Sequence, residues 1–164
     1  NKAKKEVEEC RKLGKRPKHR GLLKTNPDID EARKHLEKAE HNLSGITKFK
    51  EIGFSDWSMS AGFYCVYHCF LAIAAKFGYE SANQTCTISL MRHLNETSKI
   101  RLDERFIKLL EHERIEDIKE NSIIDLREDY TYGVQISFKD EIRLNDLKRT
   151  CKELFDVAKQ IVYE

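Results

Sequence analysis

The sequence predicts an all-α protein, an up-and-down bundle of four or five helices around a buried central helix. Three observations lead to this prediction. The middle of the chain, between Asp56 and Lys76, contains no formally charged residue apart from a histidine. The segments on either side repeat apolar residues at spacings of three and four, the pattern of amphipathic helices. Only 7 glycines and 2 prolines interrupt the 164 residues, of which 35% are charged, a composition typical of soluble helical proteins.

The central stretch, Trp57–Tyr79, reads WSMSAGFYCVYHCFLAIAAKFGY and is apolar on most sides of a helix. Such a helix is either buried in a protein core or spans a membrane. Its uncharged run is slightly shorter than the ~20 residues that a span needs, and it includes Ser58, Ser60 and His68. The rest of the chain is highly charged and offers no second span. We therefore expect a buried core helix and no contact with a membrane.

A long amphipathic helix is expected before this stretch. Asn26 as cap and Pro27 as first helical residue mark its beginning, and Gly53 marks its end. Ser55 and Asp56 are expected to cap the central helix, which should end at Gly78. The core positions of the first helix are Ile29, Ala32, Leu36, Ala39, Leu43 and Ile46.

The second half of the chain predicts shorter helices and one long one. Helical patterns are found over Ser81–Asn95, over Leu102–Leu110 and from Asn121 to about Tyr132. Val134–Phe138 alternates like a strand but has no partner strand, so we expect an extended connector. A capping box at Ser137–Asp140 then begins the last helix. Its core positions are Leu144, Leu147, Cys151, Leu154, Ala158 and Ile161.

The basic residues concentrate at the beginning of the chain. Asn1–Lys24 contains ten Lys or Arg residues against three Glu. We therefore expect two parts, a basic N-terminal helix or arm over residues 1–25 and the helical bundle over residues 26–164. The arm is either a solvated linker or a phosphate-binding patch for nucleic acid. The residues of that patch would be Lys15, Arg16, Lys18 and Arg20.

The cysteines and histidines predict neither a disulfide framework nor a metal site. The chain has five cysteines, an odd number, and its first residues lack the apolar core of a signal peptide, so reduced thiols in the cytoplasm are expected. Cys65, His68 and Cys69 share one helix face, but a structural zinc site needs a fourth ligand, usually from a second pair. We interpret them as core residues and expect no metal and no cofactor.

Three motifs together resemble the HEPN family, small four- or five-helix bundles of prokaryotes that are also appended to some eukaryotic proteins. The motifs are HLEKAEHNL at His35–Leu43, WSMSAGFYCVYH at Trp57–His68 and IDLREDYTYG at Ile124–Gly133. The resemblance spans roughly Ile29–Val162. It implies a fold more securely than an activity.

The resemblance also implies partners and a possible reaction. Members of the family commonly form homodimers, and many are encoded beside a small nucleotidyltransferase with which they act as toxin and antitoxin. Active toxins are metal-independent ribonucleases with an Arg followed by four to six residues and then a His, placed in a cleft between two protomers. An Arg can hold the scissile phosphate bidentately, and a His can move the proton of a 2′-hydroxyl near neutral pH.

The chain departs from this ribonuclease motif. Arg127 matches the Arg, but the positions of the His are occupied by Tyr132, Gly133 and Val134. The resemblance is therefore to the branch of the family without the ribonuclease motif. It predicts a non-catalytic binding module, either a partner of a nucleotidyltransferase or a nucleotide or RNA binder. The ligand-binding cleft would be lined by Arg127, Asp129, Tyr130 and Tyr132.

Three alternatives stay open from the sequence. Arg127 and Asp129 would form a structural ion pair if the tyrosines only pack. The protein would be a metal-independent endoribonuclease if Arg127 worked with a tyrosine, or with His68 or His93 brought from elsewhere. It would be a structural dimer without a ligand if no polar groups converged on a cleft.

Overall fold

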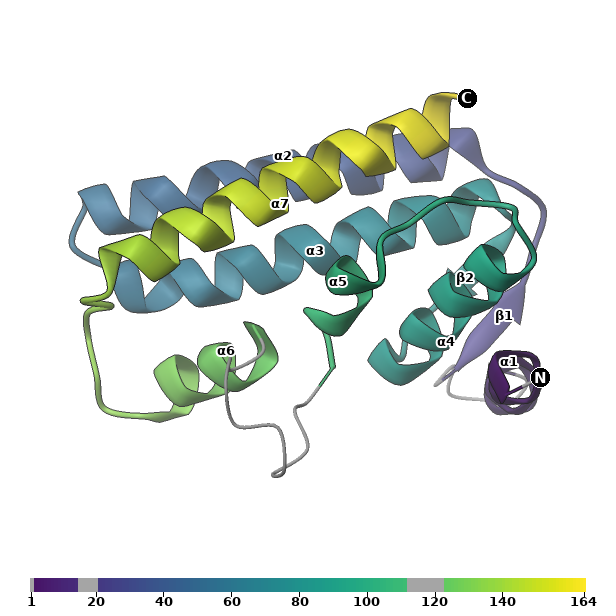
Figure 1. Cartoon of the computed structure of the whole chain (residues 1–164), viewed down its shortest axis with the longest axis horizontal. Coiled ribbons are helices and arrows are strands. Elements are labelled where there is room, and N and C mark those ends of the chain that lie inside the picture. Colours follow the sequence, from purple (N-terminus) through teal and green to yellow (C-terminus); the bar gives the residue numbers. More distant parts are fainter. Residues whose placement is uncertain (1, 15–20, 112–122) are drawn as a thin grey trace.

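The computed structural model describes residues 2–14, 21–111 and 123–164. Within these residues the protein is a helical bundle with one small sheet, which confirms the predicted fold class (Figure 1). The helices are α1 (Lys2–Gly14), α2 (Ile29–Glu51), α3 (Ser58–Lys76), α4 (Gln84–Glu96), α5 (Glu104–Lys108), α6 (Ile123–Tyr132) and α7 (Glu141–Tyr163). A 3-10 turn, η1 (Ser55–Trp57), precedes α3, and the strands are β1 (Leu22–Lys24) and β2 (Tyr79–Ser81).

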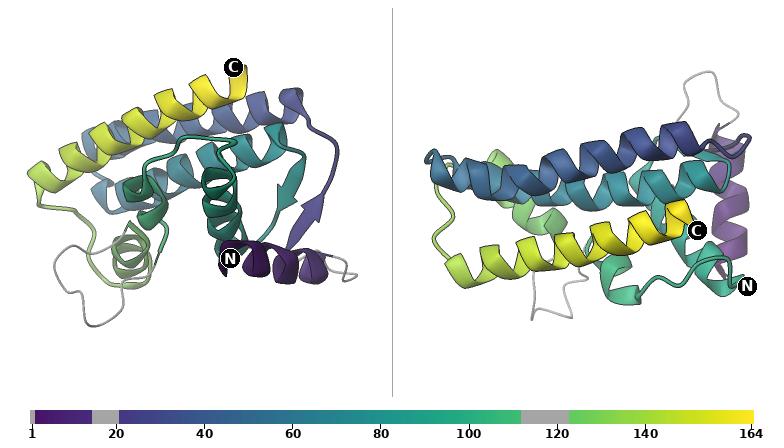
Figure 2. Two further views of the ribbon diagram at one scale, coloured as in Figure 1. Left: turned by 45° about the vertical axis from the view of Figure 1, so that its right-hand side comes forward. Right: turned by 90° about the horizontal axis from the view of Figure 1, so that it is seen from above.

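Helix α3 is the buried centre of the bundle, as the uncharged stretch predicted. The long helices α2 and α7 lie against it, and α6 packs on its N-terminal half (Figures 1 and 2). Cys65, Val66 and Phe70 are completely buried along its length. Among the described residues, Ser55–Lys76 is the one helical segment long and apolar enough to cross a membrane, and 78% of its most apolar window is buried inside the bundle. Such burial is typical of a core helix in a globular protein.

The ends of α2 and the beginning of α3 differ in part from the predictions. The cap of α2 is Asp28, whose carboxylate accepts the N–H of Glu31 at 2.8 Å, so the predicted beginning at Asn26 and Pro27 is wrong by two residues. The helix ends at Glu51 before Gly53, which has a φ of +84°, as expected. No side chain caps α3, because Ser55 instead accepts the N–H of Phe138 at 2.8 Å.

The later elements follow the predicted order. Helix α4 begins after Asn83, whose side chain accepts the N–H of Cys86, and Asp103 caps the short helix α5 in the same way. Residues 134–140 form a connector without regular secondary structure, as expected. Helix α7 begins after Asp140, whose carboxylate accepts the N–H of Arg143 at 3.0 Å. Asp140 is thus the N-cap itself, so the prediction of Ser137 as N-cap, with Asp140 as the last residue of the capping box, is wrong.

The sequence did not predict how the N-terminal segment docks. Helix α1 packs against α4, and β1 pairs antiparallel with β2, with Leu22 opposite Ser81 (Figure 2). A disulfide joins Cys10 of α1 to Cys86 of α4, so the prediction of reduced thiols is wrong for these two residues. Their pairing needed a contact between segments 76 residues apart, which the spacing of the cysteines does not reveal.

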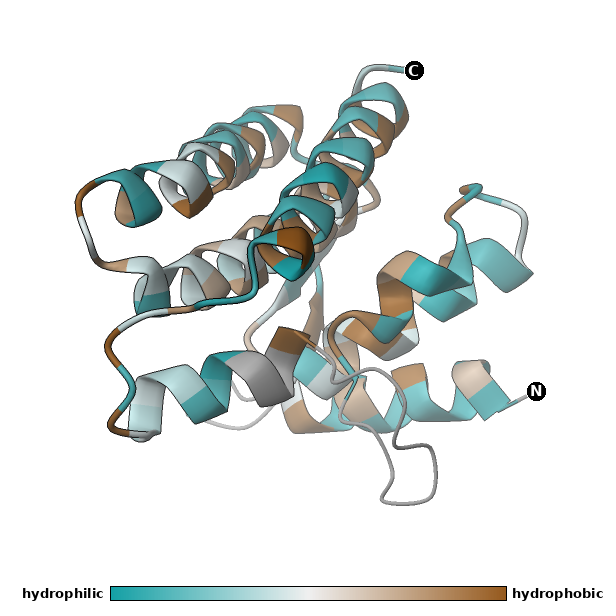
Figure 3. Ribbon diagram, turned by 60° about the vertical axis from the view of Figure 1, so that its left-hand side comes forward, coloured by the Kyte–Doolittle hydropathy of each residue, from teal (hydrophilic) through white to brown (hydrophobic). Residues whose placement is uncertain are grey.

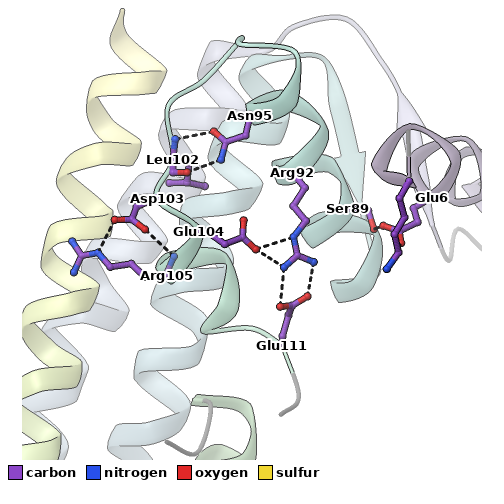
Figure 4. A network of polar contacts seen from close by, with 10 residues as sticks. Glu6, Ser89, Arg92, Asn95, Leu102, Asp103, Glu104, Arg105 and Glu111 are labelled. Atoms are coloured by element: carbon purple, nitrogen blue, oxygen red, sulfur yellow. Dashed lines mark hydrogen bonds and ion pairs between the residues drawn. The ribbon is translucent and has the colours of Figure 1, made fainter. Parts of the chain in front are cut away.

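A polar network holds the region around α4 and α5 (Figure 4). The guanidinium of Arg92 donates to Glu104 at 2.5 and 3.0 Å and to Glu111 at 2.5 and 2.9 Å. Asn95 donates to the carbonyl of Leu102 and accepts its N–H. Hydrogen bonding to these two carboxylates raises the pKa of Arg92 above its already high ordinary value. The side chain of Arg92 therefore has a structural role, since it joins α4 to Glu104 of α5 and to Glu111.

The packing of α6 and α7 on α3 depends on Gly62. A Cβ at this position would lie 2.9 Å from Leu147 and 3.0 Å from Ile123, closer than side chains normally approach. We predict that Gly62→Leu lowers the free energy of unfolding by about 3 kcal/mol, because both neighbouring helices must move away. Urea unfolding followed by circular dichroism measures this change.

The control is Gly45→Ala in α2, where a Cβ meets its nearest neighbours at ordinary distances of 3.5 and 3.6 Å. Alanine has the higher helix propensity, so this variant should be more stable by about 0.5–1 kcal/mol. Equal stability of the two variants would contradict the close packing at Gly62.

Candidate functional site

Helix α6 faces the N-terminal half of α3 with residues spaced four apart. Ile123 reaches Gly62, and the guanidinium carbon of Arg127 lies 4.4 Å from the centre of the Phe63 ring. One turn further on, the hydroxyl of Thr131 is 3.2 Å from that of Ser60. Residues four apart lie on the same face of a helix, so the docking of α6 fixes the position of Arg127.

Arg127 is held in place, and its polar contacts with the described residues are few. Its side chain is 20% exposed, and its Nη2 lies 3.7 Å from the carboxylate of Glu128. Its Nε is buried and has no hydrogen-bond partner among the described residues. A guanidinium on an aromatic face whose Nε–H has no partner among the described residues is suited to bind an anion such as a phosphate or a carboxylate.

Phe63, the ring on which Arg127 rests, belongs to a cluster of aromatic side chains on α3. The ring of Phe63 lies edge-on to Tyr64, with centres 5.1 Å apart, and stacks with Tyr67 at 6.0 Å. Tyr64 is 43% exposed, so part of its ring is available to a ligand. Burial raises the pKa of Tyr67, against a smaller opposite effect of its hydrogen bond to Thr87, so its hydroxyl stays protonated at neutral pH.

The four residues predicted for the cleft do not all lie on one face of α6. Arg127 faces Phe63, and the ring of Tyr130 packs edge-on against Phe138 at 5.1 Å. Asp129 is exposed and Tyr132 is 78% exposed, on the opposite face. The carboxylate paired with Arg127 belongs to Glu128, so the structure does not form the alternative ion pair with Asp129.

The two histidines considered as catalytic partners lie in other surroundings. His68 of α3 is joined to His35 of α2, with 3.0 Å between their Nδ1 atoms. Burial, together with His35 and Lys38, lowers the pKa of His68 to about 4, and burial lowers that of His35. Both are therefore neutral near pH 7, one donating and one accepting. His93 is on α4, and its Nδ1 is buried without a partner among the described residues.

The other predicted features give no metal site in the part of the chain that the structure describes. No group of three or more His, Cys, Asp or Glu residues there is placed to hold a metal ion. Cys65 and Cys69 are buried in the core with Cys151 of α7, which donates to the carbonyl of Gly62 at 3.7 Å. The basic patch of Lys15, Arg16, Lys18 and Arg20 lies outside the described residues.

Comparison with models of protein families shows to which family this helical arrangement belongs. The model of the HEPN domain matches residues 32–163, which include most of α2 and all of α3, α6 and α7. The chain belongs to the HEPN domain family. The match confirms the resemblance drawn from the three motifs, and α1 and β1 lie before it. A comparison with curated proteins finds no match to this chain.

Sequence reasoning identified Arg127 in this HEPN domain but did not predict that it rests on the ring of Phe63. Phe63, Tyr64 and the pair of hydroxyls of Ser60 and Thr131 were not predicted to surround it. A signal was present, because Ser58, Ser60 and Gly62 at the beginning of α3 are small enough for a neighbouring helix to approach closely. The signal did not say which helix would approach.

The His35–His68 pair predicts a loss of stability in mild acid. The pKa of His68 is about 4 in the folded protein and about 6.5 when unfolded, so the unfolded chain binds more protons between these values. Stability should therefore fall as the pH decreases from 6.5 to 4, by up to about 2 kcal/mol after allowance for screening by solvent. Urea midpoints measured at half-unit pH steps give this dependence.

His68→Gln should flatten the dependence, since glutamine does not titrate. His41→Gln, on the exposed face of α2, is the matched control and should leave it unchanged. An identical pH profile for His68→Gln and the native protein would rule out this pair as the cause.

Proposed function

We propose that this HEPN protein is a non-catalytic binding module that takes a phosphate group of a nucleotide or RNA at Arg127. The proposal rests on the contacts that the side chain of Arg127 makes. Its guanidinium rests on Phe63. Among the described residues, its Nε lacks a hydrogen-bond partner and its carboxylate contact is a 3.7 Å approach to Glu128. A charge held this way is stabilised when an anion binds it.

The groups next to Phe63 and one turn along α6 from Arg127 suit the rest of a nucleotide. The exposed part of the Tyr64 ring offers an apolar face on which a base can stack. The hydroxyls of Ser60 and Thr131 can donate to phosphate or sugar oxygens. Asp129 and Tyr132 lie on the outer face of α6, and we predict that they contact a larger ligand or a partner.

Binding is favoured over cleavage because no histidine among the described residues is placed against Arg127. Tyr132, Gly133 and Val134 stand where the ribonuclease motif has a His, and a tyrosine with a pKa of about 10 is a poor base at pH 7. His68 is already engaged by His35. These observations support the binding module over the endoribonuclease.

The proposal includes partners that the HEPN family suggests. The protein would act in the cytoplasm of a prokaryote as a homodimer, with a nucleotidyltransferase as partner in a toxin–antitoxin pair. The exposed outer face of α6 supports a partner-binding role, since Asp129 and Tyr132 are open to solvent there. A structural dimer without any ligand is the outcome to expect if no nucleotide or RNA binds.

Substitution of Arg127 tests the proposal. Fluorescence anisotropy with a labelled single-stranded RNA, and competition by mononucleotides, would measure the affinity at low salt. We predict that Arg127→Ala weakens binding 10- to 100-fold, because charge-assisted hydrogen bonds contribute about 1.5–3 kcal/mol. Arg127→Lys should lose less, since it keeps the charge but not the bidentate geometry.

Arg149→Ala is the matched control. Arg149 is another arginine paired with an acid of its own helix, Asp146, and should change the affinity less than twofold. Incubation of the same RNA with the protein in EDTA checks for cleavage. RNA cleavage that Arg127→Ala abolishes would overturn the non-catalytic assignment, and equal binding by Arg127→Ala and the native protein would overturn the site.

A further inference from the structure

Helix α1 is joined to the rest of the molecule by one covalent bond as well as by packing. It packs mainly against α4 and β1, and it lies before the part of the chain that matches the HEPN family. The covalent bond is the disulfide between Cys10 and Cys86, whose Cα atoms are 5.6 Å apart. The other three cysteines are free thiols buried in the core, so the disulfide is separate from them.

The packing of α1 involves small and polar side chains. Its buried residues, none of them larger than a valine, are Ala3, Val7, Cys10 and Gly14. Most of its other residues are charged, and hydrophilic residues make up much of this helix (Figure 3). The hydroxyl of Ser89 on α4 donates to the carboxylate of Glu6 at 3.1 Å (Figure 4). Because hydrophobic stabilisation scales with the apolar area buried, this packing alone holds α1 weakly.

Helix α1 is also poorly stable as a helix on its own. It has 13 residues, and isolated helices shorter than about 12–15 residues are marginal in water. Its first turn contains Lys2, Lys4 and Lys5 and no acidic residue, whereas the helix dipole favours acids there. The disulfide is therefore the contact that keeps α1 folded on α4, because it prevents Cys10 from leaving.

We propose that the Cys10–Cys86 disulfide is a redox switch, which holds α1 on α4 when oxidised and releases α1 when a protein dithiol reduces it. The inference rests on the cytoplasmic location in the proposed function. Disulfides of cytoplasmic proteins are usually transient, because cellular thiols keep cysteines reduced there. The switch controls the surface of α4 that carries Cys86 and Ser89, which α1 covers in the oxidised form.

The reaction is a thiol–disulfide exchange. A thiolate of the dithiol attacks the Sγ of Cys10, the more exposed of the two residues at 7% against 2%, and Cys86 leaves as a thiolate that takes up a proton. The second thiolate of the reductant then attacks the mixed disulfide and releases Cys10. Two electrons pass from the dithiol, which becomes a disulfide, to Cys10 and Cys86, which become thiols.

The switch can close again because β1 anchors the N-terminal segment. Leu22 of β1 is completely buried, and β1 pairs with β2, so this anchor should remain when the disulfide is broken. Residues 11–21 then tether Cys10 to the anchor. A short tether keeps the local concentration of Cys10 near Cys86 on the order of millimolar, which favours reoxidation.

Hydrogen exchange of the full chain, measured by mass spectrometry with and without dithiothreitol, tests the proposal. Reduction should speed the exchange of the α1 amides at least about 10-fold, because α1 loses the contact that keeps it docked, and should leave α2 and α3 unchanged. Cys10→Ser should show the fast exchange of α1 without dithiothreitol. Ser89→Ala is the matched control, since it removes the hydrogen bond to Glu6 but keeps the disulfide, and α1 should stay protected.

Maleimide labelling gives a second measurement, because it counts accessible thiols. In a glutathione buffer with the reduced form in large excess, as in the cytoplasm, Cys10 and Cys86 should become reactive while the three core thiols stay protected. Protected α2 and α3 amides would show that the reduced protein and the Cys10→Ser variant still fold.

Either of two results would overturn the proposal: a disulfide that survives the glutathione buffer, or α1 amides that exchange as slowly in the reduced protein as in the oxidised one. The proposed function fails separately, since neither measurement involves RNA. A protein that releases α1 on reduction but binds neither RNA nor nucleotide would contradict only the site at Arg127.

Discussion

The burial of α3 is the constraint from which the rest of the structure follows. This helix has no polar face wide enough for water, so other helices must cover it along its length. The amphipathic helices α2 and α7 supply the longest covers, and α6 closes the N-terminal half. Each cover approaches where α3 has a small residue, as at Gly62 for Ile123 and Leu147. The core helix thus fixes both the fold and the place of α6.

The position of Arg127 is a consequence of that packing. Because α6 is docked through Ile123 and Thr131, the arginine between them must lie over Phe63. Arg127 keeps its charge four-fifths buried against an aromatic ring, and its ion pair among the described residues is the 3.7 Å approach of Glu128, so its burial costs solvation energy. Groups that fit the fold poorly are common at functional sites, where a ligand completes their interactions.

The sequence predicted those features that depend on local patterns. The central helix, the seams of α2 and α7 and the family followed from hydrophobic periodicity and three motifs. The helix caps were predicted less accurately. Asn26 and Asp28 can both cap α2, Ser137 and Asp140 can both cap α7, and only the backbone conformation selects one of each pair. The β1–β2 pair and the Cys10–Cys86 disulfide join segments far apart in the chain, so no local pattern reveals them.

In the candidate site, too, local patterns predicted some features, whereas contacts between distant segments were not predicted. Arg127 stood out through its motif, but its neighbours Phe63 and Tyr64 belong to another helix and depend on how α6 crosses α3. Likewise, Val134 and Ile136 suggested only an extended segment, and the placement of their connector at the same end of the bundle as the α2–α3 turn needed the tertiary structure (Figure 1). Contacts between elements, rather than the elements themselves, were the part that sequence reasoning could not supply.

Native-state hydrogen exchange tests the central role of α3 most directly. If α3 is the buried axis of the bundle, the amides of residues 66–73 should exchange only through global unfolding, with a free energy equal to that from urea unfolding. The amides of α6, which covers only half of α3, should exchange faster. Exchange of α3 as fast as that of α6, under conditions where the protein is folded, would contradict this account of the fold and of the site built on it.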